Sequence, residues 1–384
     1  MIQRILMALV LLTSTYASAQ TNAELNKKLN ALIEEVQSLK NNKDSTKINF
    51  GGYGEIIYSK SEAGEDDTVG GDPTFDNKRF ILYVGYDFSS KFRLVSEIEI
   101  EHADEIYMEQ AYIEYLIDDK SSIAVGTLLI PVGLTNLKHE PTTFLSAQRS
   151  QTESRIIPTT WRENGIQYST KLNDHLIKVF AVNGLLAENG SNKFNASGVR
   201  NGRQKASQAN ARDLAIGVRY DYMLNPSAVI GGSLYNASLS YDGSSESPAT
   251  HRIVELHYDQ KVNAFDIKVL MARGIVDGAE ELNTAIGSNV ASEMNGSYIE
   301  LGYDLNHGKS DVQIIPFVRL EKINTHAVVD DNITEDKSKD ETHSTFGVNY
   351  KPLANIVFKA DYTKSKNEAK TATDSWNLGL GWNF

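Results

Sequence analysis

The chain has 384 residues, with 38 Lys and Arg against 50 Asp and Glu, and a formal net charge of −12. The absence of cysteine excludes thiol catalysis, disulfide scaffolds and Cys-based metal sites, and the acidity argues against nucleic acid as a partner. The longest apolar run, residues 5–12, is far shorter than the ~20 residues that a membrane-spanning helix needs.

Residues 1–19 have the pattern of a secretory signal peptide. Arg4 supplies the positive start, residues 5–12 form the apolar centre, and Ala17-Ser18-Ala19 is a small-residue cleavage site. The pattern predicts export of a mature chain that begins at Gln20. The alternative is an apolar helix start in a cytosolic protein.

Residues 20–45 predict a short coiled coil in the periplasm. The apolar side chains that share its 4-3-4-3 spacing are Leu25, Leu29, Leu32, Val36 and Leu39. This spacing is that of an a/d seam, at which a helix packs on partner helices. So short a helix is marginal alone, so we expect it to associate only when the rest of the chain is already oligomeric. The alternative is a single amphipathic helix packed on the next domain.

Residues 46–384 predict an all-β domain. Runs of about ten residues alternate between apolar and polar side chains, which is the period of a half-buried strand. Sixteen runs have this pattern: 47–59, 79–88, 92–101, 106–117, 122–129, 164–172, 176–185, 212–223, 228–236, 252–259, 264–273, 297–305, 312–321, 344–351, 356–365 and 375–384. The even number predicts a 16-stranded antiparallel transmembrane β-barrel.

The connections between these runs sort by length. Short links follow the even-numbered runs, whereas the odd-numbered runs are followed by long links, among them 60–78, 130–163, 186–211, 274–296 and 323–343. The link at 102–105 is the exception. Short turns at one end and long loops at the other are typical of outer-membrane barrels, and a soluble sandwich has no reason to show them.

Aromatic residues recur at fixed places on the runs. Tyr86, Tyr220, Tyr258 and Tyr303, each followed by Asp, lie at the same end of even-numbered runs, as in the aromatic girdle of a barrel. The last run places five apolar side chains on one face: Trp376, Leu378, Leu380, Trp382 and Phe384. This ending resembles the C-terminal signature of bacterial outer-membrane barrels. The resemblance implies delivery to the barrel-assembly machinery and pairing of the last strand with the first, because lipid tolerates no open edge.

One stretch resembles the phosphate-selective porin O and P family. Its motifs are Val125-Gly126, Pro131-Val132-Gly133-Leu134, Phe144 and Trp161-Arg162-Glu163-Asn164-Gly165. The resemblance implies a water-filled channel in the Gram-negative outer membrane for passive diffusion of small hydrophilic solutes or ions. It implies a third loop, 130–163, folded inward as the constriction. Together with the coil it predicts a homotrimer surrounded by outer-membrane lipid.

Charged residues give two opposing predictions about ion preference. The residues expected to contact solute at the constriction are Lys138, Glu140, Arg149, Glu153, Arg155 and Arg162. The charges expected on the lumen wall include Arg79, Arg93, Glu97, Glu99, Arg219 and Arg319, in a wall where acids outnumber bases. Acidic rings favour cations, whereas an eyelet of Arg149, Arg155 and Arg162 favours anions. The alternative is that paired wall charges select neither.

The sequence predicts no enzyme, no metal site and no cofactor. The eight histidines lack metal-ligand spacing, and no Gly-x-Ser-x-Gly elbow is present. The acidic loop at 330–341 suits a solvated loop better than a Ca²⁺ site. Two competing functions stay open: a non-channel outer-membrane barrel, enzymatic or adhesive, with a plugged lumen, and a soluble exported β-protein that binds carbohydrate.

Overall fold

The computed structural model describes residues 47–64, 69–241, 243–244 and 247–384. The predicted signal peptide and coiled coil, with its seam from Leu25 to Leu39, lie outside the described residues. Within the described part of the chain, no helix has the length and apolarity required to cross a membrane.

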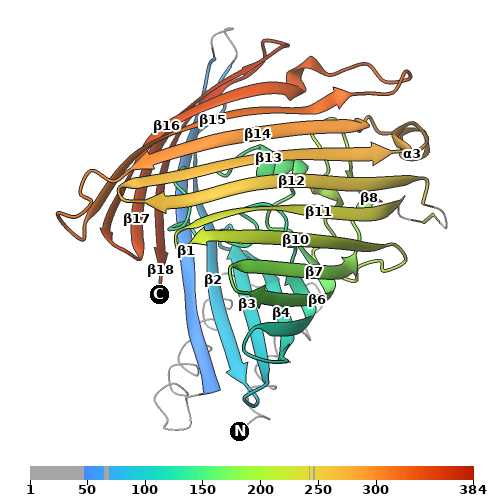
Figure 1. The fold of residues 1–384 in the computed structure, drawn as a ribbon. Coiled ribbons are helices and arrows are strands. Elements are labelled where there is room, and N and C mark those ends of the chain that lie inside the picture. The colour runs from blue at the N-terminus through green and yellow to red at the C-terminus, as the bar shows by residue number, and fades with distance from the viewer. Residues whose placement is uncertain (1–46, 65–68, 242, 245–246) are drawn as a thin grey trace.

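Sixteen antiparallel strands form a closed barrel (Figure 1). The wall strands are β1 (Ile48–Glu62), β2 (Thr74–Asp87), β3 (Phe92–Glu101), β4 (Glu105–Leu116), β5 (Ser121–Leu129), β6 (Arg162–Leu172), β7 (His175–Asn183), β10 (Leu214–Asn225), β11 (Ala228–Tyr241), β12 (Ala249–Val262), β13 (Phe265–Asp277), β14 (Glu293–Tyr303), β15 (Gln313–Val328), β16 (Asp340–Leu353), β17 (Ile356–Asn367) and β18 (Asp374–Asn383). Every predicted run overlaps one of these strands, with ends that differ by up to a few residues, so the predicted fold is confirmed.

The long connections carry small elements of their own. A hairpin of β8 (Leu186–Asn189) and β9 (Asn192–Lys193) and a 3-10 turn (Arg200–Gly202) lie between β7 and β10. Helix α3 (Ala279–Ile286) follows β13, and a second 3-10 turn (Lys337–Lys339) precedes β16. A π-helical turn (Thr152–Ile156) lies between β5 and β6. That connection ends at residue 161 and not at 163, because Arg162 and Glu163 already pair with β5.

The last strand closes the barrel against the first, as Figure 1 shows for β18 beside β1. Beyond the named strand, Phe384 and Gly52 exchange both backbone hydrogen bonds, at 2.9 and 3.0 Å. A side chain at Gly52 has no room, since its Cβ would lie 2.2 Å from the Ile81 carbonyl oxygen. Alternate residues of β18 face out and in: Trp376 and Leu378 are half exposed, whereas Asn377 between them is buried. Among the described residues, each wall strand therefore pairs with a neighbour on both sides, as a lipid environment requires.

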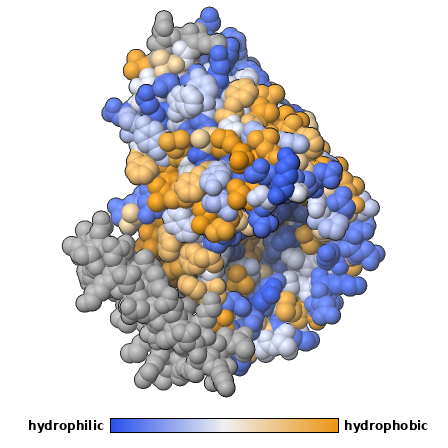
Figure 2. All heavy atoms as spheres, turned by 90° about the vertical axis from the view of Figure 1, so that its left-hand side faces the viewer, coloured by the Kyte–Doolittle hydropathy of each residue, from blue (hydrophilic) through white to orange (hydrophobic). Residues whose placement is uncertain are grey.

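The outer face of the barrel is apolar. On β12, Val254 and Leu256 are 41% and 61% exposed, whereas Ile253, Glu255 and His257 are buried inside. Figure 2 shows hydrophobic side chains gathered over the middle of the face in view, with hydrophilic residues at its top and right-hand side. This arrangement is the reverse of a water-soluble protein and is the one that a lipid environment requires.

Strand β4 departs from simple alternation at a bulge. Gln110 pairs with Glu97 and Met108 pairs with Ile98, so Glu109 is the extra residue between them. Both Glu109 and Gln110 therefore face the interior, where Glu109 is fully buried. A strict period of two places Glu109 on the lipid face, so the sequence pattern missed this internal charge.

The interior of the barrel is in part an apolar core. At the long-loop end, the inner faces of β10–β14 carry apolar side chains that pack on the connections folded against them. The rings of Trp161 and Tyr235 lie 4.8 Å apart in this core, and Phe194 packs edge-on to His251. Leu282 and Ile286 of α3 cover its end. We call this region the apolar half of the interior.

Candidate functional site

The connection between β5 and β6, residues 130–161, folds into the barrel and is called the inner loop. It is bound to the inner wall by hydrogen bonds to strands on several sides of the lumen. These bonds are Arg219 to Gly133 O, Lys351 to Thr142 O (2.8 Å), Lys359 to Phe144 O (2.8 Å), Ala147 N to Asp361 (2.6 Å) and Thr152 N to Glu321 (2.6 Å). Because they reach β10, β15, β16 and β17, the inner loop crosses the lumen.

A buried carboxylate holds the two arms of the inner loop together. Glu153 Oε1 accepts hydrogen bonds from the backbone N–H of Leu134 and Thr135, at 2.7 and 2.6 Å. Its Oε2 accepts from Tyr298 Oη of β14 at 2.7 Å. Burial raises the pKa of Glu153. The nearby Gly133 has φ +77°, and a Cβ there would lie 2.7 Å from Glu153 Oε1.

Arg219, which anchors the first arm of the loop, belongs to a buried cluster on β10–β12. Its Nε donates to Asp221 at 2.8 Å. The ring of His257 lies between two carboxylates, with Nε2 2.9 Å from Asp221 and Nδ1 2.7 Å from Glu255. The guanidinium is therefore held in place while it donates to the Gly133 carbonyl.

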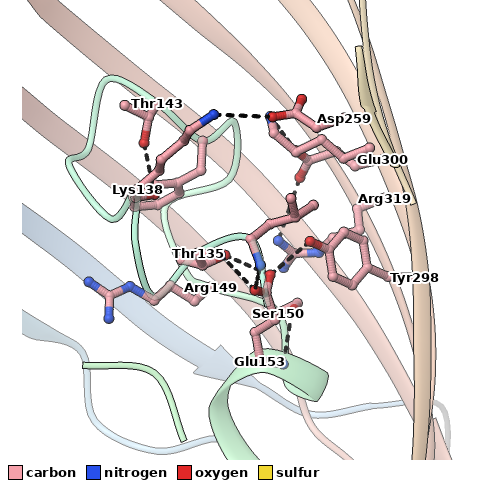
Figure 3. A pocket seen from close by; sticks show the side chains of 13 residues that line it. Thr135, Lys138, Thr143, Arg149, Ser150, Glu153, Asp259, Tyr298, Glu300 and Arg319 are labelled. Atoms are coloured by element: carbon pink, nitrogen blue, oxygen red, sulfur yellow. Dashed lines mark hydrogen bonds and ion pairs between the residues drawn. The ribbon is translucent and has the colours of Figure 1, made fainter. Parts of the chain in front are cut away.

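Two cavities adjoin the inner loop. The turn-side cavity, of about 40 Å³, lies between the loop and the charged ends of β12–β15, and Figure 3 shows its lining. The loop-side cavity, of about 420 Å³, lies between the loop and the long-loop ends of β15–β18. Arg149 and Arg319 line both cavities. These two side chains therefore lie between the two cavities.

The two shared arginines differ in how they are held. Arg319 is fixed by Ser146 Oγ at 2.5 Å, by the Gln148 carbonyl at 3.3 Å and by Glu300 at 3.6 Å. Arg149 Nη2 is buried without a hydrogen-bond partner in the described structure. In Figure 3 the Arg149 guanidinium points away from Glu153. Burial lowers the pKa of Arg149, and the charge of Arg79 acts in the same direction.

The other residues predicted at the constriction divide into a partly exposed group and a buried group. Lys138 is exposed and lies 3.8 Å from Asp259, and Arg155 pairs with Glu341 at the loop-side cavity. Glu140 is half buried, and its carboxylate accepts from Tyr83 Oη at 3.4 Å.

Arg162 and Glu153 are the buried group. Arg162 is the first residue of β6 and pairs with Glu109 at 2.9 Å, and Glu153 is enclosed by its own partners. Arg162 lines neither cavity. Glu153 lines the turn-side cavity, but its carboxylate already accepts hydrogen bonds from Leu134, Thr135 and Tyr298.

The six predicted wall charges all lie on inner-face positions, although at different depths. Arg79, Glu97, Glu99, Arg219 and Arg319 are buried, whereas the Arg93 side chain is 45% exposed near the short turns and pairs with Glu114.

Carboxylates outnumber guanidinium groups on the inner wall of β1–β4. Arg79 lies 3.3 Å from Glu55 and 3.5 Å from Glu99, and Arg162 is 3.8 Å from Glu99.

His139 of the inner loop packs against this wall. Its Nδ1 lies 3.0 Å from the Asn136 carbonyl and its Nε2 lies 4.0 Å from Glu109. Burial lowers the pKa of His139 to about 4, so the ring is neutral at pH 7. No sequence signal pointed to His139 or Glu109, because the first depends on the path of the loop and the second on a bulge. In the described residues, no three His, Asp or Glu side chains are arranged to hold a metal ion.

Comparison with known proteins gives one sequence relative and several structural neighbours. No family model matches the chain. Among solved structures, OmpF of Salmonella typhi in complex with daunomycin has a TM-score of 0.60 at 11% identity, covering 89% of this chain and 99% of that one. The outer membrane channel DcaP of Acinetobacter baumannii has a TM-score of 0.56 at 12% identity, covering 88% and 97%. The anion-selective porin of Comamonas acidovorans has a TM-score of 0.54 at 10% identity, covering 88% and 99%.

These likenesses show that the fold is that of bacterial porins. The sequence relative is an uncharacterized protein of Aquifex aeolicus (strain VF5), 30% identical over 355 residues, which are 88% of this chain and 80% of that protein. The chain therefore belongs to the same family as the Aquifex aeolicus protein.

Proposed function

We propose that this protein is an outer-membrane channel through which small hydrophilic solutes or ions diffuse passively, with the inner loop as the constriction. One observation carries the proposal: the inner loop crosses the lumen of a closed barrel, polar cavities adjoin it on both sides, and Arg149 and Arg319 line both. Passive diffusion needs a continuous polar passage and no reacting group, so the proposal includes no enzyme activity.

The location follows from the outer face. An apolar belt on a closed barrel is stable only in lipid, and barrels of this kind occur in outer membranes. One of the structural neighbours is an anion-selective porin, and this is a reason to test ions first. The resemblance to phosphate-selective porins makes inorganic phosphate one solute for that test.

Planar-bilayer recording tests the channel directly. Purified full-length mature protein should give stepwise conductance in KCl, and a cold gel without boiling should show the compact, heat-modifiable form. Replacing Arg149 by Glu should change the anion-to-cation permeability ratio. A compact barrel that conducts no ions in repeated insertions would contradict the proposal.

A plugged, non-channel barrel is the second candidate, and the apolar half of the interior favours it. Connections folded onto β10–β14 there bury a contiguous core that excludes water from that side of the barrel. The same recording separates the two functions. A folded barrel without conductance supports the plug, whereas conductance that depends on Arg149 supports the channel.

We also propose a trimer with a periplasmic coil at residues 20–45. Its support is the a/d spacing from Leu25 to Leu39. Crosslinking of the mature protein should give trimers, and deletion of residues 20–45 should weaken them. Monomers in both proteins would contradict the assembly without affecting the channel.

A further inference from the structure

We propose that the loop-side cavity is a binding site for polyhydroxylated anions, with sugar acids as the model ligands. The inference rests on the proposed channel function and names the class of solute that the channel selects. It is carried by the charge, the hydrogen-bonding side chains and the size of this one cavity.

The cavity is basic although the chain is acidic. Four cationic side chains line it, Arg149, Arg155, Arg319 and Lys339, against the carboxylates of Glu321 and Glu341. The protein as a whole has a net charge of −12, so this excess of positive charge is local. A local basic excess concentrates anions even where the remaining wall is acidic.

The carboxylates do not neutralise all of these cations. Glu341 Oε1 forms a salt bridge with Arg155, and Glu341 Oε2 lies 3.1 Å from His343 Nε2. Glu321 accepts from the backbone N–H of Thr152, and its other oxygen is 4.0 Å from Arg319.

Arg149 is the cation left for a ligand. It forms no salt bridge among the described residues, where Glu55 and Glu109 act on it only at longer range, and its buried Nη2 has no hydrogen-bond partner there. A guanidinium binds a carboxylate or phosphate through two parallel hydrogen bonds, so Arg149 provides the group that an anionic ligand requires.

Hydroxyl and amide side chains form the rest of the wall. On β17 and β18 and the connection between them these are Thr363, Ser365, Asn367, Thr371, Thr373 and Ser375. Such side chains both donate and accept hydrogen bonds, as sugar hydroxyls do. The lining includes no Phe, Tyr or Trp, so recognition there relies on hydrogen bonds and charge.

The size of the cavity agrees with a ligand of this class. Its volume of about 420 Å³ lies within the roughly 300–1,000 Å³ of small-molecule sites. An inorganic ion alone would contact only a small part of a wall of this size. The hydroxyl-bearing strands and the unpartnered guanidinium therefore favour a ligand that carries both an anionic group and several hydroxyls.

Block of the ionic current by added solutes tests the site. Glucuronate, glucose, acetate and inorganic phosphate are added in turn to channels of the full-length mature protein in KCl. We expect glucuronate to block at lower concentration than the other three, because only glucuronate combines the carboxylate with the ring hydroxyls. If glucose blocks equally well, the basic side chains do not contribute to recognition. If acetate or phosphate blocks equally well, the hydroxyl side chains do not contribute to recognition.

Variants locate the effect in this cavity. Arg149→Gln should raise the half-blocking concentration of glucuronate about tenfold, since it removes a charge-assisted hydrogen bond, and Thr363→Val about threefold. Lys337→Gln removes the same charge from an exposed residue paired with Glu368 outside the cavity, and it should leave the block unchanged. An unchanged block in Arg149→Gln would overturn the proposal.

Calorimetry separates failure of the site from failure of the channel. Glucuronate is titrated into detergent-solubilised wild-type protein and into Arg149→Gln. Binding to the wild type that Arg149→Gln weakens supports the site even if no current is seen. Absence of glucuronate binding in a conducting protein contradicts the site and leaves the channel proposal standing.

Discussion

The two sides of the barrel interior differ in what their inward residues meet. On β12, inward residues change from Ile253 near the long loops to Glu255 and His257 nearer the short turns. On β17, the inward Thr363 and Ser365 stay polar up to the long-loop end and line the loop-side cavity. The difference follows from the connections, because an apolar stretch of loop covers one wall while the other wall faces a polar cavity. The first side buries an apolar core, and the second faces the cavity in which we propose that solute binds.

The largest expected effect is the loss of packing in the apolar half. Trp161 is fully buried against Tyr235, so Trp161→Ala should lower the free energy of unfolding by about 3–5 kcal/mol. The temperature at which the compact band disappears on gels should fall accordingly. Trp376→Ala is the matched control on the outer face, where the side chain is half exposed. Equal loss in both variants would mean that the interior core is not a distinct source of stability.

The next effect concerns Glu153, the carboxylate that holds the two arms of the inner loop together. Glu153→Ala leaves the N–H groups of Leu134 and Thr135 and the hydroxyl of Tyr298 without their acceptor. We expect a loss of about 3 kcal/mol in stability and a larger, noisier conductance as the inner loop loosens. Glu153→Gln keeps one acceptor and should lie between wild type and Glu153→Ala. Unchanged conductance in both variants would show that Glu153 does not hold the loop in the lumen.

A smaller effect should appear as a dependence of stability on pH. Burial lowers the pKa of His139 from 6.5 to about 4, so between these values the unfolded chain binds a proton that the folded protein excludes. Stability therefore falls as the pH drops from about 6.5 to about 4, by about 1–2 kcal/mol between pH 7 and pH 5.

His139→Asn checks the source of this dependence. The asparagine amide retains a donor for the Asn136 carbonyl, which the His139 ring meets at 3.0 Å, but it does not titrate. Unfolding in urea at pH 5 and at pH 7 should therefore differ less in His139→Asn than in wild type. The same pH dependence in both proteins would assign it to other groups.

The comparison of the two sides of the interior also shows how much of this structure could be predicted from the sequence. Alternation locates each strand and each inner face, because both depend only on local period. It cannot tell whether an inward residue such as Ile253 meets water or a folded-in loop, since that depends on contacts between distant segments. A bulge at Glu109 changes the face without any change of composition. Arg149 and Arg319 line the same two cavities although they are 170 positions apart in the sequence, so no local pattern predicts that they lie together.

The last effect, and the most specific one for transport, is expected from charge reversal at Arg149. Arg149→Glu breaks no salt bridge in the described structure, but it places a carboxylate in a buried site on which Glu55 and Glu109 also act, so we expect some loss of stability as well. A charge within about 4 Å of a passing ion contributes about 1 kcal/mol in water, so the anion-to-cation permeability ratio should fall about fivefold or more. Arg155→Glu should shift the ratio less, because Arg155 lines only the loop-side cavity and already pairs with Glu341. Reversal potentials measured across a KCl gradient give the ratio for each variant. If Arg155→Glu has the larger effect, the narrowest point of the channel lies at the loop-side cavity, and Arg149 does not line the constriction.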